Sequence, residues 1–217
     1  MDKQQLLDQV AKDIIATKGG PMATFGTNPV PGEGSCEAEI LFIGEAPGAT
    51  EDQMRRPFVG VSGQLLRKQI VEAGFKIEDV YITNIVKFRP PENRDPLPAE
   101  IEFFKPFLDR QIAIIEPKVI VTVGRFSMYK FVGEGVSISK IHGVPRLVSW
   151  NGKRIYVFPM FHPAAALRAG EMMKMFTEDF KKLREFIEKL DSNGSQADVT
   201  DEKVEAKSPL AKQMELI

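Results

Sequence analysis

The stretch EILFIGEAPGATED, residues 39–52, decides the fold that the sequence predicts. Residues 39–43 are nearly all apolar, which is typical of a strand buried on both faces of a parallel sheet. Gly44, Pro47 and Gly48 then form a rigid turn whose backbone amides can point at an acceptor. The stretch therefore predicts a buried strand that runs into either a ligand-binding turn or a plain loop.

Three further apolar segments outside this stretch have the same strand character, at residues 80–86, 119–123 and 155–161. Helical patterns alternate with them: Ser62 can cap one helix, Pro98 can open a second, and Thr177 can cap a third. Asn151-Gly152 between two short strands is a strong hairpin signal. Strands alternating with helices predict a three-layer α/β/α fold around a central, mainly parallel four-stranded sheet.

Composition places the chain among soluble globular proteins. Of its 217 residues, 43% are hydrophobic and 27% are charged. No apolar run approaches the roughly 20 residues that a membrane helix needs, and the N-terminus lacks the apolar core of a signal peptide. Cys36 is the only cysteine, so it makes no intrachain disulfide and cannot alone hold a cysteine-ligated metal. We expect a cytoplasmic protein without membrane contact.

Polarity divides the chain into a domain at 1–190 and a tail at 191–217. The tail has no aromatic residue, and most of it is polar without a period, which predicts disorder. The formal net charge is −1, and the tail contributes −3 of it, so the domain carries +2. A weakly positive domain is compatible with phosphate binding but does not require it.

The carboxyl ends of the predicted strands hold most of the unusual polar chemistry. Ligands of open α/β sheets bind outside these ends. The rule selects four segments, GEAPGATED (44–52), TNIVKFRPPENRD (83–95), GRFS (124–127) and FHPAAALR (161–168). Their convergence predicts a site at one edge of the sheet.

Single residues in and near these segments have two interpretations each. Asn84 ends a strand and can both donate and accept, which suits a base edge or a turn. His162 is either a catalytic or a structural histidine, and Phe58 is either core or a stacking platform. Three basic residues either hold phosphates or form a solvated face: Lys87, Arg89 and Arg94.

Three motifs in order carry a family resemblance: GEAPGATED…RPFVGVSGQLL, ITNIVKFRPPENRDPLPAEI and FHPAAALR, with PGEG (31–34) upstream. Together they resemble family 4 uracil-DNA glycosylases of the uracil-DNA glycosylase superfamily. The resemblance runs from about residue 21 to residue 190. It implies DNA repair by flipping out uracil and hydrolysing its N-glycosidic bond, which leaves an abasic site.

The resemblance also implies the roles of residues that hold the base. Glu45 and Ala46 would hold one edge of the flipped uracil, Phe58 would stack on the ring, and Asn84 would read the amide edge. Where other branches of the superfamily carry an aspartate, this chain has Ala46, as family 4 members do.

Roles in catalysis and DNA binding follow from the same resemblance. Glu51, Asn84 and His162 would be catalytic, with Glu51 placing water and His162 facing the uracil O2. Leu167 would wedge into the duplex with Arg168 alongside. From their place among prolines, and not from the resemblance, we assign phosphate contacts to Lys87 and Arg89.

One departure from the family pattern concerns a cofactor. Family 4 members that resemble this chain usually carry four cysteines that hold a 4Fe–4S cluster. The corresponding positions hold Thr17, Gly20, Phe88 and Phe104. Phenylalanine has no ligand atom, and threonine and glycine do not replace thiolates. We expect no cofactor and no metal, with the two phenylalanines as an apolar plug in the place of the cluster.

Two rival functions stay open from the sequence: a sensor that flips damaged bases without cutting, and a glycosylase for hypoxanthine or xanthine. The expected partner is uracil-containing DNA, and we expect a monomer. Gln213, Leu216 and Ile217 resemble the short peptide by which bacterial repair proteins bind the sliding clamp. A frayed tail with chance apolar residues is the alternative for that segment.

Overall fold

A six-stranded sheet forms the centre of the computed structural model, which describes residues 1–25 and 28–192. The strands lie in the order β1-β3-β2-β4-β6-β5. The four predicted strands form its parallel centre, so the mainly parallel sheet is confirmed. The expected count of four is corrected to six, because an antiparallel strand is added at each edge. The strands are β1 (Glu33–Gly34), β2 (Ile40–Gly44), β3 (Tyr81–Asn84), β4 (Val119–Val123), β5 (Arg146–Trp150) and β6 (Lys153–Met160).

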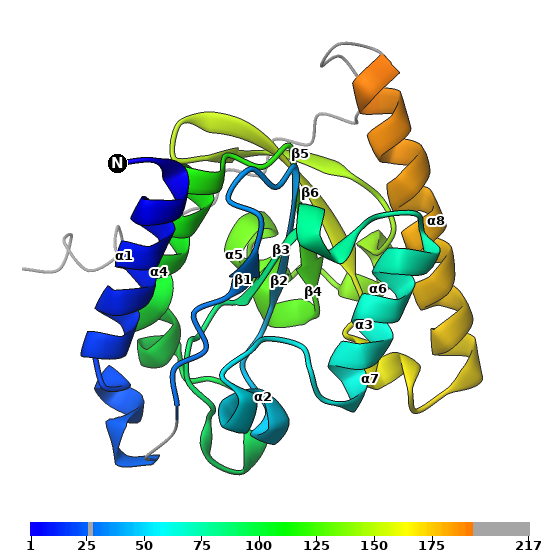
Figure 1. Cartoon of the computed structure of the whole chain (residues 1–217). Helices are drawn as coiled ribbons and strands as arrows, with labels where there is room; N and C mark the ends of the chain where they lie inside the picture. Colours follow the sequence, from blue (N-terminus) through cyan, green and yellow to red (C-terminus); the bar gives the residue numbers. More distant parts are fainter. Residues whose placement is uncertain (26–27, 193–217) are drawn as a thin grey trace, which may run out of the picture.

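Helices cover both faces of this sheet, which gives the three predicted layers (Figure 1). Helices α1, α4 and α5 pack on one face, and α3 and α8 pack on the other. The longer helices are α1 (Lys3–Ala16), α3 (Val61–Glu72), α4 (Pro98–Ile115), α5 (Arg125–Val132) and α8 (Gly170–Ser192). Short helices are α2 (Ala49–Met54), α6 (Ile138–Ile141) and α7 (Pro163–Ala166), and 3-10 turns occupy Gly20–Phe25, Ile77–Asp79 and Pro91–Asn93.

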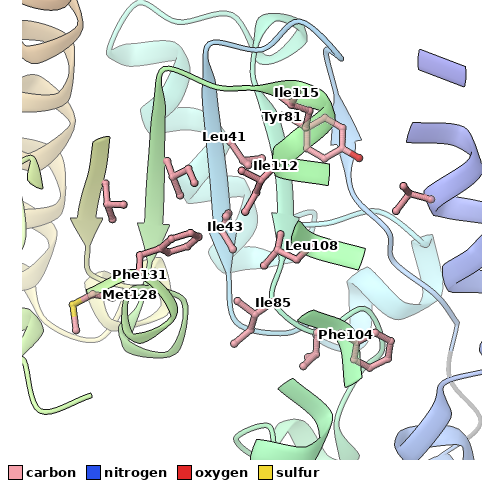
Figure 2. Close-up of a cluster of buried hydrophobic side chains, with 14 of the residues drawn as sticks. Leu41, Ile43, Tyr81, Ile85, Phe104, Leu108, Ile112, Ile115, Met128 and Phe131 are labelled. Atoms are coloured by element: carbon pink, nitrogen blue, oxygen red, sulfur yellow. The ribbon is translucent and has the colours of Figure 1, made fainter. Parts of the chain in front are cut away.

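Each central strand sends side chains alternately into two apolar cores, as the two-residue period of a strand requires. In β2, Leu41 and Ile43 point into the core under α1, α4 and α5, whereas Ile40 and Phe42 point into the core under α3 and α8. Figure 2 shows the first core, where Leu108 and other α4 side chains pack onto the sheet. Burial on both faces explains why these strands read as continuous apolar runs.

Two predicted helix starts differ from the observed ones. Helix α3 begins after Gly60 rather than at a Ser62 cap: Gly60 is extended and occupies the N-cap position, so Ser62 lies in the first turn of the helix. Helix α8 begins at Gly170, seven residues before Thr177. Its first two turns bury Phe176, which extends the apolar stripe of the helix and stabilises the additional turns.

The predicted domain boundary lies close to the end of the described chain. Helix α8 continues to Ser192, two residues beyond the expected end of the domain. The expected disorder of the tail and the peptide containing Gln213, Leu216 and Ile217 lie outside the described residues. Within residues 1–25 and 28–192, no helix combines the length and apolar character needed to cross a membrane.

Candidate active site

A pocket of about 390 Å³ opens at the carboxyl ends of the parallel strands, where the strand-end rule places a site. Three of the four selected segments line it, and 124–127 does not. A second hollow, of about 410 Å³ near α5 and α6, contains none of the predicted site residues. The pocket is lined by Glu45, Ala46, Pro47, Gly48, Glu51, Phe58, Ser62, Asn84, Pro90, Asn93, Arg94, His162, Ala164 and Arg168.

Asn84 ends β3 at the bottom of this pocket and is almost fully buried. Its Oδ1 has no hydrogen-bond partner in the described part of the chain. A buried acceptor without a donor is costly, so it is typical of a site that a ligand completes. A Cβ at Gly44 would lie 2.5 Å from this Oδ1 and 2.4 Å from the Phe58 ring, so only glycine fits beside them.

Phe58 supplies the aromatic wall of the pocket. Its ring is buried, and its centroid lies 6.0 Å from that of His162. The backbone of Phe58 has a φ of 52°, a conformation that residues with a Cβ seldom adopt. The platform interpretation of this residue is therefore compatible with its place, although the ring also contributes to the core under α3 and α8.

Glu51, in the first turn of α2, brings a buried carboxylate to the pocket. Its Oε1 accepts hydrogen bonds from the backbone amides of Val59 at 2.9 Å and Gly60 at 2.7 Å. A Cβ at Gly48 would lie 2.9 Å from the other oxygen, Oε2. Glycine at 48 therefore leaves the space that this carboxylate occupies.

His162 follows β6 and caps the short helix α7. Its Nδ1 accepts a hydrogen bond from the Ala164 amide at 3.2 Å, so in the neutral ring the proton is on Nε2. Burial lowers the pKa of His162 to about 4, against the opposing charge of Glu51. At neutral pH the ring is an uncharged donor at Nε2. The other histidine, His142, lies outside the pocket and pairs with Asp179 at 2.8 Å.

Glu45 lies at the turn after β2. Burial raises the pKa of its carboxyl to about 7, the negative charge of Asp95 acts in the same direction, and Arg125 opposes both. Arg125 itself forms an ion pair with Asp95. Glu45 is thus divided between its protonated and charged forms near neutral pH.

The rim of the pocket carries both predicted and unpredicted residues. Arg168 lines it, and the neighbouring Leu167 is an apolar side chain with 47% of its surface exposed. Arg89 donates through Nε to Asn93 Oδ1 at 2.9 Å. Two polar side chains that line the pocket were not predicted as site residues from the sequence: Asn93 and Ser62. Both lie inside motifs from which other residues were predicted to belong to the site.

Lys87 is a correction to the predicted DNA contacts. Its side chain is fully buried, and Nζ donates to Thr83 Oγ1, the Asn84 carbonyl and Gln111 Oε1, each at 2.7 Å. Burial, with the nearby charge of Lys130, lowers the pKa of Lys87 well below its usual value. A phosphate cannot reach this amine, because it lies beneath the end of β3 rather than on the surface.

Comparison with known proteins identifies the family. The model of the Uracil DNA glycosylase superfamily matches residues 31–190. The type-4 uracil-DNA glycosylase of Sulfurisphaera tokodaii is 48% identical over 184 residues, covering 82% of this chain and 84% of that protein. The chain is a type-4 member of the uracil-DNA glycosylase superfamily. Type-4 uracil-DNA glycosylases of Saccharolobus solfataricus (46% identical; 83% and 86% covered) and Thermotoga maritima (42% identical; 86% and 97% covered) are similar to it as well.

The four positions that hold cluster cysteines in this glycosylase family do not fit an iron–sulfur cluster here. Phe88 and Phe104 are buried with ring centroids 5.9 Å apart and stacked planes. Thr17 donates its hydroxyl to the Ile14 carbonyl at 2.6 Å, and a Cβ at Gly20 would collide with the Phe103 ring. Across the described residues of this glycosylase, no group of three or more His, Cys, Asp or Glu side chains is placed to hold a metal ion.

Proposed function

We propose that this protein excises uracil from DNA by hydrolysing the N-glycosidic bond, leaving an abasic site. The observation that carries the proposal is Asn84 Oδ1, a buried acceptor without a partner among the described residues, beside the Phe58 ring. Uracil supplies the missing donor through N3–H. Cytosine presents an acceptor at N3, which would leave two acceptors facing each other in a buried place.

Binding of the base begins with its extrusion from the duplex, at a cost of a few kcal/mol. Stacking on Phe58 offsets part of this cost, since base–aromatic stacking contributes about 1–3 kcal/mol. Asn84 Nδ2 donates to uracil O4 while Oδ1 accepts from N3–H. The pocket selects a base by its edge and its flat shape together.

Bond cleavage leaves negative charge on the uracil and positive charge on the sugar. Neutral His162 donates through Nε2 toward O2, where the negative charge grows, and the turn at Glu45 and Ala46 holds the same edge of the base. The Glu51 carboxylate, held by two amides, orients water and stabilises the sugar cation. Removing one donor to such a developing anion typically lowers a rate by about 10²–10³.

We assign the DNA contacts to residues at the rim of the pocket. Exposed Leu167 enters the space that the flipped base leaves, and Arg168 beside it contacts the backbone. Arg89 lies on the same rim through its bond to Asn93 and is the remaining proposed phosphate contact.

A strand-cleavage assay on a uracil-containing oligonucleotide tests the function, with alkali to break abasic sites. We expect cleavage opposite guanine and in single strands, and its loss in Asn84→Ala and His162→Ala. Protein that binds such DNA without forming abasic sites would instead be a sensor of damaged bases. Faster cleavage at hypoxanthine or xanthine than at uracil would establish the shifted substrate.

Activity without an iron–sulfur cluster is part of the proposal. It is supported by the stacked, buried pair Phe88 and Phe104 at two of the four cluster positions. Purified protein is expected to be colourless and to contain no stoichiometric iron. Four iron atoms per chain would refute this part while leaving the excision of uracil intact.

We propose that the segment 213–217 binds a sliding clamp, with Leu216 and Ile217 in an apolar pocket of the clamp and Gln213 at the rim of that pocket. The glycosylase domain at 1–190 would then be tethered near DNA as a cytoplasmic monomer. Deleting residues 212–217 should leave cleavage of a short oligonucleotide unchanged and abolish binding to a purified clamp. Full-length protein that does not bind the clamp at micromolar concentrations would refute this proposal.

A further inference from the structure

Phe58, the aromatic wall of the pocket, has an unfavourable backbone conformation. Phe58 has a positive φ of 52°, which places its Cβ close to the following carbonyl group. Such a conformation persists where surrounding contacts hold it. The contacts that hold residues 57–60 therefore decide where the Phe58 ring lies.

The amide side of this loop is held by the carboxylate already described. Glu51 Oε1 accepts from the amides of Val59 and Gly60, the two residues that follow Phe58. These two bonds fix the end of the loop that enters α3. They do not involve the carbonyl groups of Pro57 and Phe58, which accept hydrogen bonds from a different residue.

Arg67, on α3, holds the carbonyl side. Its Nε donates to the Phe58 carbonyl at 2.7 Å, and its Nη2 donates to the Pro57 carbonyl at 2.7 Å. Gly63, one helical turn earlier on the same face, lies directly under the loop, where a Cβ would be 2.1 Å from the Phe58 carbonyl carbon. The guanidinium thus grips the two peptide groups that flank the Cα of Phe58.

Glu33 fixes the guanidinium in turn. Its Oε1 accepts from Arg67 Nη2 at 2.5 Å, and the Arg67 side chain is only 17% exposed. Arg56 also pairs with Glu33, through bonds of 2.7 and 3.0 Å, and its side chain is 55% exposed. No bond from Arg56 to the Pro57 or Phe58 carbonyl occurs in the described part of the chain. The two arginines share a partner and a charge but differ in their contact with the loop.

We propose that Arg67, oriented by Glu33, is a positioning residue that sets the Phe58 ring for stacking on the flipped base. The inference rests on the proposed function of the pocket and adds a residue outside it. Charge-assisted bonds to carbonyl groups are the strong class of hydrogen bond, and their planar donor fixes direction as well as distance. Without them the loop relaxes toward a negative φ at Phe58, and the ring leaves its place beside Asn84.

The test compares single-turnover uracil release, with enzyme in excess, by Arg67→Met and by Arg56→Met as a control matched in charge. Arg67→Met should lower the maximal rate about tenfold to a hundredfold, the scale expected of a displaced positioning group. Arg56→Met should weaken affinity for cytosine-containing DNA to a similar extent as Arg67→Met, because both remove one positive charge. Its maximal rate of uracil release should change less than about twofold, since it leaves the loop in place. If Arg67→Met does not fold, Arg67→Lys serves instead, because one ammonium group does not reproduce the planar grip on two carbonyl groups.

A second comparison separates positioning from general destabilisation. In a Phe58→Ala background, Arg67→Met should lower the rate less than about twofold, because the ring it positions is absent. The inhibition constant of free uracil should rise by the same factor in Phe58→Ala and Arg67→Met. The proposal would be overturned if the rate loss of the double variant equalled the product of the losses in Phe58→Ala and Arg67→Met. It would also be overturned if Arg67→Met released uracil at the same rate as Arg56→Met.

A binding measurement distinguishes failure of the Arg67 proposal from failure of the proposed function. Fluorescence anisotropy measures the selectivity of binding for uracil-containing over cytosine-containing DNA, and it requires no excision. Wild-type protein that binds selectively without releasing uracil would refute excision, and the Arg67 comparison would then be read from that selectivity. Wild-type protein with neither release nor selectivity would refute both. Loss of selectivity in Arg67→Met but not in Arg56→Met supports the positioning role in either case.

Discussion

Replacing Phe104 by alanine removes the central ring of an aromatic cluster between α4 and the N-terminal segment. The Phe104 side chain is fully buried, stacks on Phe88 at 5.9 Å and meets the edge of Phe103 at 5.0 Å. Truncating a buried phenylalanine costs about 3–5 kcal/mol in free energy of unfolding. For a domain of this size that corresponds to a fall in Tm of about 6–20 °C.

The assay is urea unfolding followed by circular dichroism, with Phe103→Ala as the matched control on the same helix. Phe103 is 36% exposed, so its truncation should cost about 1 kcal/mol. None of these rings lines the pocket, so uracil release by folded Phe104→Ala should stay close to the wild-type rate. Equal and small losses in the two variants would refute the proposal that Phe104 fills the place of a cluster by packing.

Three further predictions concern the pocket. The pKa of His162 is about 4 in the folded protein and near 6.5 in an unfolded chain, so the free energy of unfolding should fall as the pH drops from about 6.5 to 4. Urea titrations should show a smaller fall in His162→Asn. Deprotonated Glu45 places negative charge beside the developing uracil anion, so the single-turnover rate should decline as the pH rises through about 7, and Glu45→Gln should remove that decline. Gly48→Ala puts a Cβ 2.9 Å from Glu51 Oε2 and should slow uracil release about tenfold or more, whereas Gly170→Ala, with nothing within 4 Å, should not.

The parallel centre of the sheet could be predicted from the sequence because its strands are buried on both faces. The β1 strand could not, because Glu33 and Gly34 pair with β3 through backbone atoms and carry no apolar signal. The hairpin of β5 and β6 was visible in Asn151-Gly152, whose φ values of 46° and 76° are those of a tight turn. An edge strand such as β1, which has neither an apolar pattern nor a turn signal, therefore could not be predicted from the local sequence.

The site was predictable to the extent that strand ends gather in space. Asn84 ends one parallel strand, and Glu45 and His162 come after two others, so the strand-end rule brings them to one pocket without knowledge of the fold. Lys87 shows where such reasoning fails, because its acceptor Gln111 lies 24 positions away on α4. From the local sequence, a lysine among prolines is predicted to lie at the surface, and only the contact with Gln111 shows that it is buried.

The buried amine of Lys87 has a thermodynamic consequence for recognition. Through its bond to the Asn84 carbonyl it restrains the end of β3 before any base arrives, and Thr83 and Gln111 tie the same network to the Pro31 carbonyl. The conformational entropy of this strand end is therefore lost when the chain folds, and little ordering is left for the moment of binding. Uracil binding measured by calorimetry should carry a small entropic penalty in the wild-type protein and a larger one in Lys87→Met.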